Sequence, residues 1–130
     1  MIKINVKKQS SYPVSTSKLR AALKVFFKGQ GIVSDAEVSV AIVGEARMLS
    51  LGKKYLKENS RVAHDVLSFT QEEVRGKFIY PPDGLIHLGE IVICYPRVVA
   101  TAKKEGKLID EVVKELAVHS ALHLMGVHHE

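Results

Sequence analysis

The chain has 130 residues, of which 46% are hydrophobic and 25% charged, which excludes a disordered chain and predicts one globular domain over residues 1–130. Nineteen lysines and arginines against 14 acidic residues give a formal charge of +5, which favours polyanionic partners, although a merely soluble basic protein has the same balance. A single cysteine, Cys94, excludes an internal disulfide. Without a secretory leader or a run long enough to span a membrane, the sequence predicts a cytoplasmic protein.

The spacing of hydrophobic residues predicts four strands and four helices. The predicted strands cover residues 2–6, 37–43, 65–69 and 86–94, and the predicted helices cover about 15–31, 45–57, 96–105 and 110–124. A serine or threonine at 15–17 caps the first helix, and Asp110 is the expected N-cap of the last. Residues 70–84 read as an exposed loop. Strands and helices are interspersed, so we expect a single α+β domain with a mixed sheet.

Two histidines on the last predicted helix are four residues apart. His119 and His123 therefore project from one face of that helix, about one turn apart. Gly126 then ends the helix and lets the chain return a third imidazole, from His128 or His129. Three neutral histidines leave one position of a tetrahedral zinc ion open to water, as in catalytic zinc sites.

The helix around these histidines is apolar on nearly every side, which predicts that it is buried. A buried imidazole without a partner costs about 1–3 kcal/mol, and a shared metal removes that cost for both rings. The alternatives are a hydrogen-bonded core histidine and a solvent-exposed pair at the terminus. Ser120 follows His119 where the H-E-x-x-H proteases have glutamate, which argues against peptide hydrolysis.

Three blocks of the chain resemble the YbeY-type endoribonucleases, the rRNA maturation factors. Residues 119–129, HSALHLMGVHH, resemble the family signature H-G-x-L-H-L-x-G-y-D-H in register. Residues 64–70, HDVLSFT, resemble T-D-V-L-S-F-P, and residues 88–94, LGEIVIC, resemble L-G-D-I-V-I-S. The blocks occur in the family's order and span about half of the chain.

The resemblance implies a zincin-like α+β fold with one zinc ion on the C-terminal helix, held by His119, His123 and His129. It further implies cleavage of single-stranded RNA in small-subunit rRNA maturation and ribosome quality control, with the small ribosomal subunit as partner. Spacing alone leaves the choice between His128 and His129 open.

The chain departs from the family pattern at several positions. His128 stands where the family has aspartate, and Ser120 replaces a glycine. Leu56 follows Tyr55 where the family has an arginine, and Arg61 is a candidate substitute that would contact phosphate. The family chain usually continues beyond the third histidine.

The expected mechanism uses zinc to lower the pKa of a bound water toward 7 and to present hydroxide to a phosphodiester. Our candidate catalytic residues are His119, Arg61, Asp65 and Glu90. Asp65 and Glu90 are the acidic members of the matched blocks and could orient a ligand histidine. Alternatively, Asp65 caps a turn and Glu90 lies on the solvated face of a strand.

Three functions fit these residues. The first is a metal-dependent endoribonuclease acting on ribosomal RNA. The second is a metal-dependent hydrolase of another substrate, because an open zinc site activates water for several electrophiles. The third is a ribosome-associated RNA-binding protein in which zinc only stabilises the last helix.

Overall fold

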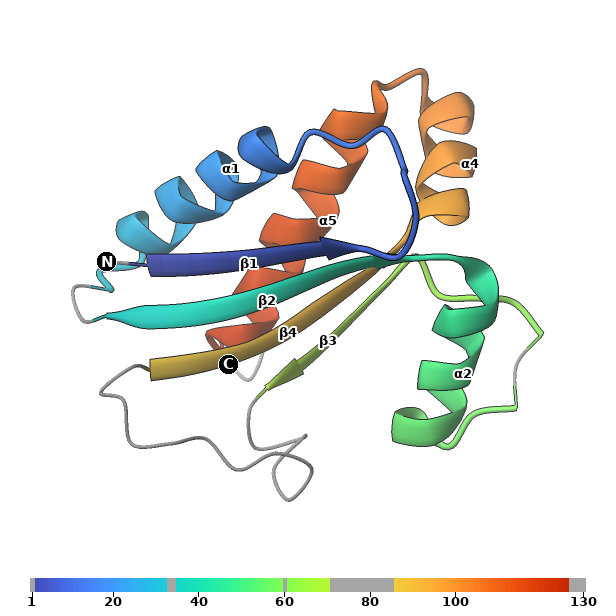
Figure 1. Cartoon of the computed structure of the whole chain (residues 1–130), viewed down its shortest axis with the longest axis horizontal. Helices are drawn as coiled ribbons and strands as arrows, with labels where there is room; N and C mark the ends of the chain where they lie inside the picture. Colours follow the sequence, from blue (N-terminus) through green and yellow to red (C-terminus); the bar gives the residue numbers. More distant parts are fainter. Residues whose placement is uncertain (1, 33–34, 60, 71–85, 127–130) are drawn as a thin grey trace.

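The computed structural model describes residues 2–32, 35–59, 61–70 and 86–126. Their elements are, in chain order, β1 (Ile2–Lys8), α1 (Thr16–Gly29), β2 (Ala36–Val43), α2 (Glu45–Leu56), β3 (Val66–Thr70), β4 (Ile86–Cys94), α4 (Tyr95–Glu105) and α5 (Ile109–Leu124). The described residues thus contain the four strands and four helices that the sequence predicts (Figure 1). None of these helices is long and apolar enough to cross a bilayer. The predicted loop over residues 70–84 lies outside the described residues, apart from Thr70, which ends β3.

The four strands form one mixed sheet in the order β1-β2-β4-β3. β1, β2 and β4 run parallel, and β3 pairs antiparallel with β4 at one edge. Parallel neighbours need a crossover connection, and α1 supplies the one between β1 and β2. The predicted α+β class and mixed sheet are confirmed.

The side chains of the sheet alternate between two hydrophobic clusters, one on each face. Val40, Ile91 and Ile93 belong to the larger cluster, which α1, α4 and α5 cover. Val92 and Phe69 belong to the smaller cluster, which α2 covers. Figure 1 shows α2 on the opposite side of the sheet from the other three helices. Because consecutive residues of a strand point to opposite faces, this division decides which strand side chains can reach α5.

The caps of the helices agree with prediction at α1 and differ at α5. Ser15 is the N-cap of α1, and its hydroxyl accepts a hydrogen bond from Lys18 N at 3.2 Å. The prediction of Asp110 as N-cap is wrong, because the N-cap of α5 is Leu108, two residues earlier in the chain. Asp110 instead accepts a hydrogen bond from Ser15 N at 3.0 Å, which joins the first turns of α1 and α5.

Candidate functional site

The histidine pair lies on one helix, as predicted. His119 and His123 belong to α5, with one turn between them. The expectation that both rings are buried is wrong, because His119 is exposed and His123 is half-buried. Only part of the helix packs on the sheet, through residues such as Ala117 and Ala121. Because His119 is exposed, it pays no cost for burial without a partner, and that cost cannot support a metal at this residue. The position of His119 and His123 on the same face of the helix still supports a shared metal.

The chain turns at the end of α5. Gly126 has a φ of +76°, and its N–H donates to the carbonyl of His123 at 3.0 Å. This left-handed conformation ends the helix and favours glycine. Both candidates for the third ligand, His128 and His129, lie outside the described residues. Within the described residues, no group of three potential ligands has the arrangement of a metal site. The donors that the structure does describe are two imidazoles one turn apart on the same helix, and imidazole nitrogen is a ligand that suits zinc.

A contact between Leu124 and Gly89 holds the C-terminal turn of α5 against the sheet. A Cβ at Gly89 would lie 2.9 Å from Leu124 Cδ2 and 2.2 Å from the carbonyl oxygen of Phe69. Gly89 also has a φ of +136°, in a region that side chains disfavour. Leu124 directly follows His123, so this contact helps to position the histidine. This contact is not among the features predicted from the sequence, although a glycine inside a β-branched strand marks a close approach of this kind.

Glu90 lies on the face of the sheet away from α5. Its partners in the register are Ser39 on β2 and Phe69 on β3. Phe69 belongs to the cluster under α2, and alternation along β4 puts Glu90 on the same face as Val92. The expectation that Glu90 orients a ligand histidine is corrected, because the sheet lies between its side chain and α5.

Asp65 lies at the other end of the β3–β4 pair, beside Cys94. Its carbonyl accepts a hydrogen bond from Cys94 N at 2.9 Å, directly before β3 begins. Cys94 is five residues from Gly89, where Leu124 packs, which corresponds to roughly 16 Å along the strand. Asp65 and the C-terminal turn of α5 therefore lie at opposite ends of this pair of strands. The structure does not place Asp65 as a partner of His123.

The charges around Cys94 also show where Asp65 lies. Burial raises the pKa of the Cys94 thiol above its ordinary value of 9.0, and the carboxylates of Glu45 and Asp65 add to the rise. A hydrogen bond to the backbone of Arg97 and the charge of its guanidinium oppose it. Cys94 is fully buried at the junction of β4 and α4, so it packs as a small hydrophobic side chain.

The raised pKa makes a prediction about stability at alkaline pH. Above about pH 9 the thiol ionises in the unfolded chain, whereas in the folded protein it stays protonated. The contribution of Cys94 to the free energy of unfolding is therefore complete below that pH and is lost as the pH rises. We expect the wild type to be more stable than Cys94→Ala at pH 7, and the difference to narrow between about pH 8 and 10. Urea denaturation of both proteins across this range measures it. A difference that stays constant would contradict the prediction.

Arg61 lies in the connection between α2 and β3, with its side chain exposed. α2 covers the face of the sheet opposite to α5, so the structure does not bring Arg61 together with the histidine pair. Tyr55, at the end of α2, packs its ring against Phe69 at 4.8 Å between centroids. The role proposed for Arg61, contacting phosphate in place of the family arginine, stays a prediction, and the position of Arg61 in the fold does not support it.

The remaining described histidines each contact a carboxylate. His64 Nε2 lies 2.6 Å from Glu58 Oε1, in the connection after α2. His87 Nδ1 lies 3.3 Å from Glu37 Oε1, across β4 and β2. The first contact lies within the connection between α2 and β3, and the second joins two strands that are neighbours in the sheet.

Comparison with known proteins places this domain in a family. The sequence model described as "Endoribonuclease YbeY" matches residues 3–130. A relative named endoribonuclease YbeY from a Roseiflexus species is 31% identical over 117 residues, which cover 90% of this chain and 72% of the relative. Another, from Moorella thermoacetica, is 34% identical over 128 residues, covering 94% and 80% of the two chains. The solution structure of a Thermotoga maritima protein has the same fold, with a TM-score of 0.58, 23% identity, and coverage of 93% of this chain and 71% of that one.

The fold and the histidine-bearing helix define a small α+β domain of the class that the sequence predicts. The family match is more specific, because it extends over nearly the whole chain. This protein belongs to the endoribonuclease YbeY family. The family predicted from the three sequence blocks is confirmed, and with it the enzyme class, a hydrolase acting on RNA.

Proposed function

We propose that this protein is a zinc-dependent, single-strand-specific endoribonuclease. It acts in the cytoplasm in maturation of small-subunit ribosomal RNA and in ribosome quality control, with the small ribosomal subunit as its partner. The observation that carries the proposal is the pair His119 and His123 on α5, in a chain whose relatives are named endoribonuclease YbeY. The formal charge of +5 supports binding of a polyanion.

The residues of this chain contribute to the reaction in three ways. His119, His123 and His129 would hold the zinc ion, which when bound supplies a Lewis acid and a water of lowered pKa. His119 is exposed, so an RNA strand can approach it from solvent without any opening of the core. The packing of Leu124 against Gly89 fixes the last turn of α5 and thereby limits the directions in which His123 can point.

Metal removal and restoration test the proposal. We expect the zinc-loaded protein to cut a single-stranded fragment of small-subunit rRNA and to leave a fully paired duplex of the same sequence intact. Dialysis against a chelator should abolish cleavage, and one equivalent of zinc should restore it. Gel analysis of end-labelled RNA measures cleavage, and elemental analysis of the same samples measures the zinc bound per chain.

The same experiment separates the other functions. Zinc bound at one equivalent without cleavage would favour the RNA-binding protein with structural zinc. Cleavage that survives chelation would contradict zinc dependence. Hydrolysis of a simple phosphodiester at a rate equal to that of RNA would favour a hydrolase of another substrate.

A further inference from the structure

The positive charge of this chain is concentrated in its N-terminal segment. Residues 1–34 contain seven of the 19 lysines and arginines and none of the 14 acidic residues, so they carry a formal charge of +7 and the rest of the chain −2. The described part of this segment forms β1 and α1, at one edge of the sheet (Figure 1). The excess charge that favours a polyanion therefore belongs to one part of the fold.

Three of these cations form a row along α1. Arg20, Lys24 and Lys28 are four residues apart, so they follow one side of the helix over roughly 12 Å. The Nε of Arg20 donates to the carbonyl of Ile4 at 3.3 Å, which shows that this side faces β1, the edge strand. Ala22, about half a turn of the helix from Lys24, lines the cavity between α1 and α5. The row therefore lies on the side of α1 away from α5 and its carboxylates.

No carboxylate pairs with this row within the part of the chain that the structure describes. The guanidinium of Arg20 contacts the carbonyl of Ile4 and, at 3.5 Å, the hydroxyl of Thr16. Lys24 and Lys28 are exposed, and the ion pairs among the described residues involve other side chains. The charge of the row is therefore available to a ligand from solvent.

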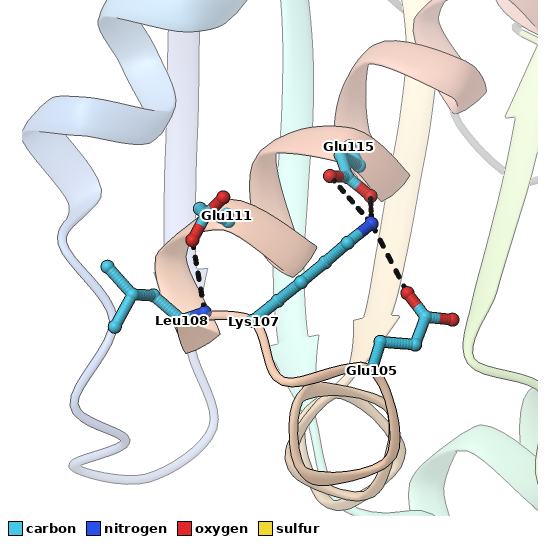
Figure 2. A network of polar contacts seen from close by, with 5 residues as sticks. All are labelled: Glu105, Lys107, Leu108, Glu111 and Glu115. Carbon is cyan, nitrogen blue, oxygen red and sulfur yellow. Dashed lines mark hydrogen bonds and ion pairs between the residues drawn. The ribbon is translucent and has the colours of Figure 1, made fainter.

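Lys107, at the corner between α4 and α5, shows the opposite arrangement. Its ammonium lies 2.9 Å from Glu115 Oε2 and 3.2 Å from Glu105 Oε1 (Figure 2). Hydrogen bonds to these two carboxylates, with Glu115 first, raise the pKa of Lys107. This lysine joins two helices and has a clear structural role, which the lysines of the α1 row lack.

The composition of α1 does not serve the stability of the helix. Like charges four residues apart destabilise a helix, and acidic residues in its first turn would stabilise it. α1 has three cations at that spacing and no acidic residue in the first turn. The macrodipole accounts for Lys28, in the last turn, but not for Arg20 and Lys24. A ligand that supplies the missing negative charge accounts for all three.

The row lies at the same end of the sheet as the histidine pair. In the register Ile4 pairs with Val38, and Val38 pairs with Gly89. Ile4 and Gly89 are therefore at the same level of the sheet, two strand spacings or roughly 10 Å apart. Gly89 contacts Leu124, the residue after His123, and α1 and α5 cover the same face. An extended strand bound at the histidine pair can thus also reach the row.

We propose that the α1 row binds phosphates of the RNA substrate on one side of the place where it is cut. Cations that contact phosphate add affinity by releasing counterions and do not depend on base sequence. RNA is favoured over an acidic protein because this family consists of hydrolases acting on RNA, whose charges repeat along the strand as the cations repeat along α1. This role rests on the proposed function, since it takes the histidine pair as the site of cleavage.

The salt dependence of RNA binding tests the row without relying on cleavage. The probe is a fluorescent single-stranded RNA of about 15 nucleotides, and anisotropy gives its Kd for the full chain, both as purified and in chelator. We expect Lys24→Gln combined with Lys28→Gln to weaken binding about tenfold or more in about 0.1 M salt. The slope of log Kd against log salt concentration should fall by about 1.4, because each phosphate contact contributes about 0.7.

The matched control removes the same charge elsewhere. Lys103→Gln combined with Lys104→Gln changes two exposed lysines in the last turn of α4, which packs on α5 on the other side from α1 (Figure 1). This control should change Kd by less than about twofold. An equal loss in the control would show that total charge matters and would refute the assignment to α1.

Cleavage kinetics separate binding from chemistry. With the long RNA, Lys24→Gln combined with Lys28→Gln should raise KM about tenfold and leave kcat within about twofold, because the row contacts ground state and transition state alike. A dinucleotide, whose single phosphate must lie at the histidine pair, should be cut equally by variant and wild type. A fall in kcat on both substrates would contradict a role confined to binding.

Three further outcomes decide between explanations. Equal salt dependence of the wild type and the α1 variant would refute the proposal. A melting temperature of the α1 variant below that of the wild type would assign the two lysines to the stability of the helix and also count against it. Loss of binding to anionic lipid vesicles, with RNA binding unchanged, would identify a membrane surface instead. If the wild type binds RNA through the row but cuts none, the proposed cleavage fails while the row stands.

Discussion

Replacing Gly89 by alanine is expected to destabilise the protein by about 3–5 kcal/mol, a large fraction of the total stability of a domain. The new Cβ would lie 2.2 Å from the carbonyl oxygen of Phe69, which is backbone of the neighbouring strand and cannot move alone. The φ of +136° adds strain for any residue with a side chain. Because Gly89 pairs with Thr70 in the register, relief would require β3 to separate from β4.

Urea denaturation followed by circular dichroism measures this loss, with Gly29→Ala as the matched control. Gly29 ends α1, and a Cβ there would meet nothing within 4 Å. We expect the control to change stability by less than about 1 kcal/mol. Equal effects of the two substitutions would show that β3 does not approach Gly89 as closely as the structure has it.

Gly89→Ala is also expected to affect the histidine pair. The added Cβ would press on Leu124, at 2.9 Å, and so displace the last turn of α5 next to His123. Zinc affinity should therefore fall even under conditions in which the variant remains folded. The measurement is a zinc competition titration at low temperature, with Gly29→Ala again as the reference.

Local patterns in the sequence were sufficient to predict the elements of this fold. The helical spacing of Leu19, Leu23 and Phe27 predicts α1, and all three residues are buried. The β-branched run of β2 predicts a strand, and its alternate residues Val38, Val40 and Ile42 belong to the core under α1 and α5. These signals are local, because each depends on how one segment presents its apolar face.

The relations between elements could not be read from the sequence in the same way. Glu90 belongs to a family-like block, yet only the pairing of β4 with β2 and β3 reveals that it faces α2. Aspartate is a usual N-cap residue, but the carboxylate of Asp110 instead accepts a hydrogen bond from the backbone N–H of Ser15, the N-cap of α1. The exposure of His119 depends on which side of α5 packs on the sheet. Because the helix is apolar on nearly every side, its sequence alone did not indicate that side. In each case a contact between distant segments overrode a local preference.

Removal of either imidazole from α5 should have the largest effect on activity. We expect His119→Ala and His123→Ala each to lower RNA cleavage on the order of 10³-fold, because a zinc ion held by fewer ligands no longer activates water in place. The double variant should be no worse than either single variant, since residues that act as one unit give strongly non-additive losses. His64→Ala is the control, because His64 contacts Glu58 in the connection after α2 and should change cleavage by less than about twofold.

The exposure of His119 makes these variants informative about mechanism as well as metal binding. His119 contributes little to the core, so His119→Ala should unfold at nearly the same temperature as the wild type when both are free of zinc. Added zinc should then raise the melting temperature of the wild type and have a much smaller effect on His119→Ala, because only the wild type gains binding energy in the folded state. A variant that keeps both the zinc-dependent rise and the cleavage rate would show that the imidazole of His119 is no ligand. A variant that loses cleavage but keeps the full rise in melting temperature would assign the metal to other residues and leave His119 with a role toward RNA alone.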